Sequence, residues 1–145
     1  MGETLFDLKG RIAVVTGASR GLGQYLGRAL ARAGADLVIT SRRLPDLKGF
    51  KDEIEGLGRR VLPLELDVRD ETSIRQMAND AVSHFGKVDI LVNNAGCNIR
   101  KPVIDITWED WNLVLDTNLR GSFFVSQLRE SIRSKFHRPQ ATFDR

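Results

Sequence analysis

The sequence predicts a single α/β domain in which helices cover both faces of a doubly wound parallel sheet. Apolar, β-branched segments alternate four times with segments of helical spacing, which is typical of parallel strands joined by right-handed crossovers. The fourth apolar segment, Val88–Val92, is apolar on both faces, as expected of a buried parallel strand. The length of 145 residues, with 41% hydrophobic and 28% charged residues, is that of one globular domain.

Glycines join the first strand to the first helix. The run Arg11–Thr16 is expected to form the strand, and Gly17, Gly21 and Gly23 follow it directly. The helix that begins there is expected to end at Gly34. Its predicted apolar face consists of Leu22, Leu26, Ala29, Leu30 and Ala33.

Two further strand–helix units follow. Asp36–Ser41 is the second predicted strand, and a weaker helix over about Pro45–Leu57 is closed by Gly58. Arg60–Val68 is the third predicted strand. The next helix has the clearest spacing and ends at Gly86; its apolar positions are Ile74, Met77, Ala78, Ala81, Val82 and Phe85.

After the fourth strand, Thr107 and Asp110 have the spacing of an N-terminal capping pair. We expect them to open one long helix with apolar positions at Trp111, Val114, Leu115, Phe124, Leu128 and Ile132. The sequence contains no linker, repeat or low-complexity stretch.

The segment Ile12–Gln24 is the most informative part of the chain. Its order of strand, glycine-rich turn and helix brings backbone N–H groups and the positive end of a helix toward a phosphate. Glycine lets the backbone approach a pyrophosphate more closely than a residue with a Cβ would. The alternative is an ordinary glycine-rich βα turn without a ligand. The context favours binding of a dinucleotide.

The end of the second strand predicts which dinucleotide is bound. An acidic residue there would bind the ribose 2′-hydroxyl of NAD, but this chain has Ser41 and Arg42, with Arg20 in the glycine turn. Guanidinium groups bind phosphate through two parallel hydrogen bonds, so we predict NADP, with NAD as the alternative cofactor. A solvated arginine cluster is the other interpretation. Asp67 could accept a hydrogen bond from the adenine amino group, or could instead cap a turn or helix.

Four motifs, in order, resemble those of the short-chain dehydrogenase/reductase family. Thr16–Gly23 matches its Thr-Gly-x-x-x-Gly-x-Gly loop, Asp67-Val68 its adenine-side aspartate, Asn93–Gly96 its Asn-Asn-Ala-Gly segment, and Asn118 the asparagine of its long helix. The resemblance runs from about Leu8 to Gln127. It implies a Rossmann-type sheet with strand order 3-2-1-4 that continues to a fifth strand, hydride transfer between NAD(P) and an alcohol or carbonyl, and dimers or tetramers.

The resemblance also implies roles for individual residues. In the family, the Asn-Asn-Ala-Gly segment stabilises the central strand and lines the cofactor, and the helix asparagine bends the helix and holds a water in a proton path. Asn118 is therefore the candidate catalytic residue; alternatively, it is an interior asparagine that bonds its own helix backbone. The candidate cofactor-binding residues are Thr16, Gly17, Ser19, Arg20, Gly21, Leu22, Gly23, Ser41, Arg42, Asp67, Val68, Asn94, Ala95 and Gly96.

The chain departs from the family beyond its fourth strand. The family's catalytic Ser and Tyr-x-x-x-Lys do not occur; the only tyrosine is Tyr25, and Ala29 stands four residues after it. We expect a binding domain over residues 1–135, an irregular tail over 136–145, and truncation before the fifth strand. A genuine short protein, a truncation and a shifted reading frame are all compatible with this ending.

The predicted function is that of an NADP-dependent oxidoreductase lineage of which this chain carries the dinucleotide-binding half. A small-molecule alcohol or carbonyl would be the substrate only of a completed site. The alternatives are an inactive dinucleotide-binding or interaction protein, and an inert remnant. The segment Asn98–Pro102 resembles the basic loop of gluconate 5-dehydrogenases and related sugar-acid enzymes, which suggests a sugar acid or polyol; it could equally be a solvated loop.

Composition argues against other classes of function. The net charge of +3 is small and its basic residues are scattered, which argues against nucleic-acid binding. No apolar stretch is long enough to span a bilayer, and the isolated His84 and His137 predict no metal site. A single cysteine, Cys97, favours a cytoplasmic location. An unpaired fourth strand and an uncovered long helix would favour self-association.

Overall fold

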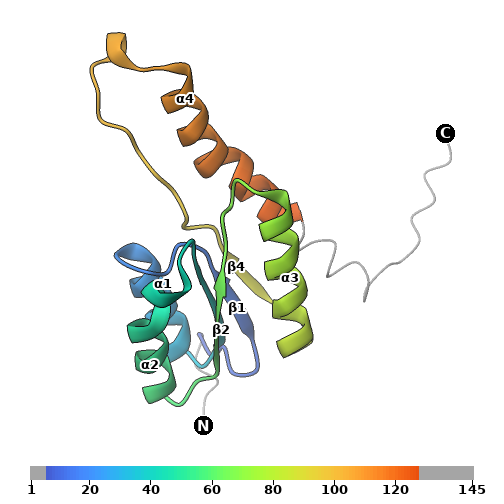
Figure 1. Cartoon of the computed structure of the whole chain (residues 1–145). Helices are drawn as coiled ribbons and strands as arrows, with labels where there is room; N and C mark the ends of the chain where they lie inside the picture. The colour runs from blue at the N-terminus through green and yellow to red at the C-terminus, as the bar shows by residue number, and fades with distance from the viewer. Residues whose placement is uncertain (1–5, 128–145) are drawn as a thin grey trace, which may run out of the picture.

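Four parallel strands form the sheet in the computed structural model, which describes residues 6–127 (Figure 1). They are β1 (Ile12–Val15), β2 (Asp36–Ser41), β3 (Val61–Glu65) and β4 (Ile90–Val92), in the order β3-β2-β1-β4. The predicted order is therefore confirmed. The predicted tail over 136–145 lies outside the described residues.

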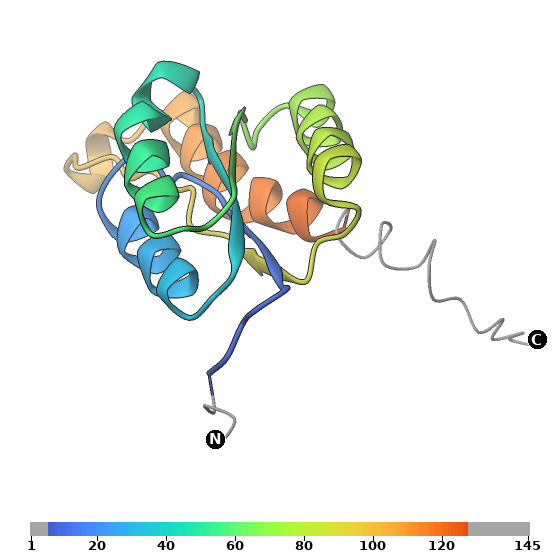
Figure 2. The ribbon, with the colours of Figure 1, turned by 90° about the horizontal axis from the view of Figure 1, so that it is seen from below.

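Helices cover both faces of this sheet. Helices α1 (Leu22–Arg32) and α2 (Lys48–Gly56) lie on one face and α3 (Glu71–Phe85) on the other (Figure 2). A short 3₁₀ helix, Leu44–Leu47, precedes α2. Each face has its own apolar cluster, one around β1, β2 and α2, and the other around β1, β2 and α3. Strand β2 contributes to both clusters, and all six of its residues are buried.

The predicted apolar face of α1 is only partly right: Leu30 packs against the apolar cluster around β1 and β2, but Leu22 and Ala29 are exposed. Leu22 is 65% exposed, and the buried residues of this helix are Gly23, Gly27 and Ala31. Small residues are needed there because the helix lies close to its neighbours: a Cβ at Gly27 would stand 2.9 Å from the ring of Phe50. A hydrophobic pattern alone therefore finds part of the packed face and misses its glycines.

The predicted long helix begins as expected and is then interrupted. Helix α4 (Trp108–Leu115) starts with the predicted capping box, in which Thr107 and Asp110 bond reciprocally. A π-helical turn, Asp116–Gly121, follows, and helical structure continues through residues 122–127. The predicted positions Leu128 and Ile132 lie outside the described residues.

Helix α4 extends beyond the carboxyl edge of the sheet, so the predicted apolar stripe is mostly uncovered (Figure 1). Trp111 is 56% exposed, and Val125 is the buried apolar residue that follows the π turn. Strand β4 is shorter than predicted and only half-buried, because it forms an edge of the described sheet. No helix within residues 6–127 is long and apolar enough to cross a membrane.

Candidate functional site

A cleft of about 1070 Å³ lies where the strands end and their connections begin. Ligands bind at this edge in doubly wound sheets, and the volume is at the upper end of the usual range of about 300–1,000 Å³. Twelve of the predicted site residues line it: Gly17, Ser19, Arg20, Gly21, Leu22, Ser41, Arg42, Asp67, Val68, Asn94, Ala95 and Gly96. Thr16, Gly23 and Asn118 lie outside this lining.

The glycine turn between β1 and α1 forms one wall of the cleft. Gly17 and Gly21 have φ values of 65° and 57°, a region in which a side chain is strained. A Cβ at Gly23 would stand only 2.3 Å from the carbonyl oxygen of Gly17. Helix α1 begins without a side-chain cap and without an acidic residue in its first turn. Its free backbone N–H groups can therefore serve an anion.

Thr16 and Asn94 hold the turn against the end of β4. The Asn94 amide donates to the backbone oxygens of Thr16 at 3.1 Å and of Gly17 at 3.0 Å. The buried hydroxyl of Thr16 accepts from the backbone N–H groups of Asn94 and Ala95, each at 3.0 Å. Thr16 is therefore a positioning residue behind the cleft wall.

Basic side chains lie at the end of β2. Ser41 is buried and Arg42 is exposed, and neither Arg42 nor Arg20 forms a hydrogen bond or an ion pair within residues 6–127. Arg43, the next residue, lies 3.9 Å from the Asp46 carboxylate. Two unpaired guanidinium groups thus line the cleft, and an incoming phosphate can meet them without breaking an existing pair.

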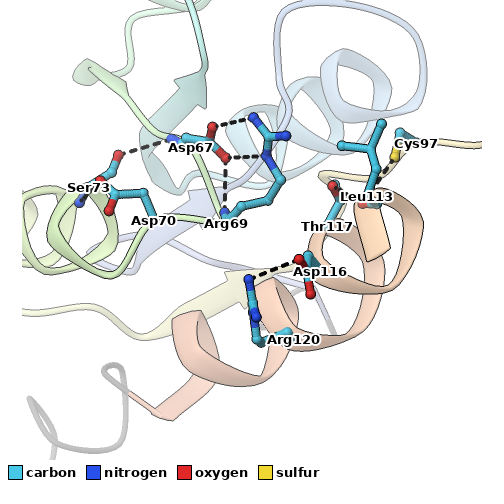
Figure 3. Close-up of polar contacts among 9 residues, drawn as sticks. All are labelled: Asp67, Arg69, Asp70, Ser73, Cys97, Leu113, Asp116, Thr117 and Arg120. Atoms are coloured by element: carbon cyan, nitrogen blue, oxygen red, sulfur yellow. Dashed lines mark hydrogen bonds and ion pairs between the residues drawn. The ribbon is translucent and has the colours of Figure 1, made fainter. Parts of the chain in front are cut away.

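Asp67, which follows β3, is already paired (Figure 3). The guanidinium of Arg69 donates to its two carboxylate oxygens at 3.0 and 2.7 Å, and the backbone N–H of Arg69 donates to Oδ1 at 2.9 Å. The hydrogen bond from Arg69 holds the pKa of the Asp67 carboxyl below its ordinary value, although burial opposes this shift. Asp67 therefore caps the turn after β3, which was the alternative role predicted for it from the sequence.

Asn118 does not bond the backbone of its own helix through its side chain. Its amide group donates to the backbone oxygen of Cys97 and accepts from the backbone N–H of Cys97, each at 2.8 Å. These two bonds link the π turn that contains Asn118 to the irregular segment that follows β4. Asn93 adds a second link, since its amide donates to the Ser126 hydroxyl at 2.8 Å.

The structure adds lining residues that the sequence did not predict: Thr40, Arg43, Asp46, Leu66, Arg69, Cys97, Leu113 and Thr117. The sequence did contain a signal for Arg69, a cation two residues after an aspartate in a turn. Of the basic loop, Arg100 is exposed and Lys101 binds Asp110 at 2.5 Å. Among the described residues, no cluster of three or more His, Cys, Asp or Glu could hold a metal ion.

A comparison with known protein families identifies the family of this chain. A family model described as short chain dehydrogenase matches residues 11–132. The chain belongs to the short-chain dehydrogenase family. This membership supports a dehydrogenase or reductase lineage whose fold binds a nicotinamide cofactor.

Individual members of the family are similar over most of this chain. The 2-dehydro-3-deoxy-D-gluconate 5-dehydrogenase of Escherichia coli is 39% identical over 122 residues, which are 84% of this chain and 47% of that protein. The crystal structure of a short-chain type dehydrogenase/reductase from Mycobacterium marinum has a TM-score of 0.88 and 34% identity, covering 91% of this chain and 53% of that one.

A third match carries a cofactor. A blue fluorescent protein from a metagenomic library, solved in complex with NADPH, has a TM-score of 0.81 and 34% identity, covering 86% of this chain and 52% of that one. The short-chain dehydrogenase described here spans about half the length of the curated relatives it matches.

Proposed function

We propose that the cleft binds NADP in preference to NAD. The observation that carries this proposal is the pair of unpaired guanidinium groups that line the cleft, Arg42 directly after β2 and Arg20 in the glycine turn before α1. The last residue of β2, where an acidic side chain would accept from a ribose 2′-hydroxyl, is Ser41. A 2′-phosphate would bind there through charge-assisted hydrogen bonds.

We place the rest of the dinucleotide from the chemistry of the residues that line the cleft. The pyrophosphate would lie against the N–H groups at the start of α1, where Ser19, Gly21 and Leu22 line the cleft. The adenine would lie beside Asp67 and Val68. The nicotinamide end would extend toward Asn94, Ala95 and Gly96. The segment that contains them is linked to the π turn after α4 by the hydrogen bond between Asn118 and Cys97.

The binding proposal is tested by thermal unfolding of the full chain with NADPH. A ligand that binds only the native state adds about 2.7 kcal/mol of stability at a hundredfold excess over its Kd. The midpoint of unfolding should therefore rise with NADPH concentration. Adenosine, which carries no phosphate, serves as the control ligand and should leave the midpoint nearly unchanged. A midpoint that NADPH does not move would contradict the proposal.

We further propose that the lineage transfers a hydride between the nicotinamide and an alcohol or carbonyl group. The family's proton-transfer tyrosine and lysine have no counterpart among these 145 residues, and Tyr25 is 69% exposed outside the cleft. The 145-residue polypeptide alone should therefore bind NADPH without turnover. Assays of sugar acids, polyols and simple ketones check this. Turnover of about 1–10³ per second that survives Tyr25→Phe would contradict it.

A carboxylated polyol is the substrate class that we propose for the complete site. Two features support it: the similarity to a 2-dehydro-3-deoxy-D-gluconate 5-dehydrogenase, and the cations Arg100 and Lys101 after the Asn-Asn-Ala-Gly segment. Of the two cations, Lys101 is engaged by Asp110, so Arg100 is the one that we expect to meet a carboxylate.

We also propose that the chain pairs with a second copy through α4 and the segment that follows it. Four apolar side chains there are more than half exposed, namely Trp108, Trp111, Leu119 and Phe123. A patch of this kind is typical of an interaction surface. Sedimentation should show an assembly, and Leu119→Lys with Phe123→Lys should yield a monomer. The control is Leu57→Lys, at an exposed position directly after α2, and this variant should still assemble. A folded parent that sediments as a monomer at high micromolar concentration would contradict the proposal.

A further inference from the structure

The turn after β3 contains a carboxylate whose hydrogen-bonding capacity is nearly but not completely used. An ionised carboxylate has about four acceptor sites. Oδ1 of Asp67 accepts both from the backbone N–H and from Nε of Arg69, and Oδ2 accepts from the terminal guanidinium nitrogen of Arg69. One acceptor site therefore remains, on Oδ2. The side chain is one-third exposed and lines the cleft.

The same turn is held in place from its other side (Figure 3). The Ser73 hydroxyl accepts from the backbone N–H of Asp67 at 3.0 Å, and Asp70 caps α3 by accepting from the N–H of Ser73. Arg69 has only one strong partner within residues 6–127, the Asp67 carboxylate. Its fork therefore fixes the plane of that carboxylate, which a single hydrogen bond would leave free to rotate.

We propose that Arg69 is a positioning residue for base recognition: it holds the Asp67 carboxylate in one orientation, with the remaining acceptor site of Oδ2 directed at the amino group of an adenine. The proposal rests on the dinucleotide site proposed above and names how that site selects its base. A base with a keto oxygen in place of the amino group would face the carboxylate with a second acceptor. The site would thus accept adenine and reject hypoxanthine.

The charges around the pair favour the ionised carboxylate that this role needs. Arg69 lowers the pKa of Asp67 through its hydrogen bond, and Arg42, which follows β2, lowers it further by its charge. The hydrogen bond to Asp67 and the charge of Asp67 in turn raise the pKa of the Arg69 guanidinium, with smaller electrostatic contributions from Cys97 and Asp116. Asp67 can accept the hydrogen bond from the adenine amino group when its carboxyl is ionised, above its pKa. This hydrogen bond is lost as the pH falls through that pKa. Removal of Arg69 should therefore move this loss to higher pH.

The test compares NADPH with its hypoxanthine analogue by calorimetry on the full 145-residue chain at neutral pH. The parent should bind NADPH about tenfold more tightly or better, since one charge-assisted bond separates the two ligands. Arg69→Ala should reduce this ratio to within about threefold, with the affinity for the hypoxanthine analogue and the unfolding midpoint nearly unchanged. Arg69→Lys should give an intermediate ratio, because it keeps the charge and loses the fork.

Arg75→Ala is the matched control, since Arg75 forms a similar pair with Glu71 on the exposed side of α3. It should leave the ratio unchanged. A second readout is the ¹³C NMR titration of the Asp67 carboxyl, whose midpoint should rise in Arg69→Ala because the hydrogen bond that lowers the pKa is lost. A purely structural ion pair between Arg69 and Asp67 would also move this midpoint but would leave the ratio unchanged, so the ratio decides the positioning role.

The outcomes separate the two proposals. If the parent prefers adenine and Arg69→Ala keeps the full ratio, or binds NADPH more tightly than the parent, the positioning role is wrong. If the parent binds NADPH without preference between the two bases, the contact of Asp67 with the base is wrong and the role of Arg69 falls with it. If the parent binds neither ligand, the dinucleotide site itself is wrong.

Discussion

Replacement of Gly23 by alanine is expected to cost the chain both stability and most of its affinity for NADPH. The added Cβ would stand 2.3 Å from the Gly17 carbonyl oxygen and 2.7 Å from the Asn94 amide nitrogen. The first of these atoms belongs to the backbone, so the start of α1 must move away from the turn. Overpacking of this kind costs about 1–3 kcal/mol. The same movement displaces the N–H groups that we assign to the pyrophosphate, which should weaken binding about tenfold or more.

Gly49→Ala is the control for this prediction. Gly49 lies in α2, and a Cβ there would meet nothing within 4 Å. The substitution should leave NADPH affinity unchanged and should add about 0.5–1 kcal/mol of stability, since alanine is the better helix former. Chemical unfolding and calorimetry measure both quantities. A Gly23→Ala chain that binds NADPH like the parent would mean that the turn does not hold the pyrophosphate.

Replacement of Arg42 by aspartate is expected to reverse the choice of cofactor. The change removes a cation from the proposed 2′-phosphate site and adds an anion that repels the phosphate. The new carboxylate can also accept from the 2′-hydroxyl of NAD, as acidic residues at this strand end do. Each charge-assisted bond contributes about 1.5–3 kcal/mol, so the preference should shift by at least about tenfold toward NADH. Arg42→Ala should remove most of the preference without reversing it.

Arg43→Ala tests whether position 42 matters in particular. Arg43 is the neighbouring arginine, and its guanidinium lies near Asp46 rather than unpaired. Its removal should reduce the preference much less than removal of Arg42. Equal effects of the two alanine variants would indicate a diffuse basic surface instead of a specific phosphate contact. Retention of the NADPH preference in Arg42→Asp would exclude Arg42 from that contact altogether.

The central strands could be predicted closely because burial leaves a clear mark on the sequence. Every residue of Asp36–Ser41 is buried, and the predicted bounds of this strand agree with the structure. The edge strands were predicted too long: β3 ends at Glu65, and β4 begins at Ile90. Val88 packs against an apolar cluster without belonging to the strand, so its hydrophobicity does not mark the strand boundary. The buried face of α1 was predicted only in part, because Gly23 and Gly27 allow close approach to neighbouring residues, which a hydrophobic pattern does not register.

Some features of the site could be predicted from local sequence motifs, and others depend on contacts between distant parts of the chain. The glycine turn, Asp67 and Asn94 follow from short motifs, because a backbone that approaches a phosphate needs particular residues at fixed spacing. The partners of these residues did not follow. The amide of Asn118, which lies in the π turn, bonds the backbone of Cys97 across 21 positions. Distant pairings of this kind arise only when the sheet brings the segments together.

The most direct measurement is the pair of dissociation constants of the full chain for NADPH and NADH, determined by calorimetry at the same salt concentration. The unpaired Arg20 and Arg42 beside Ser41 predict that NADPH binds at least about tenfold more tightly. The difference should shrink at higher salt, because exposed charges are screened. Equal dissociation constants, or tighter binding of NADH, would contradict the account.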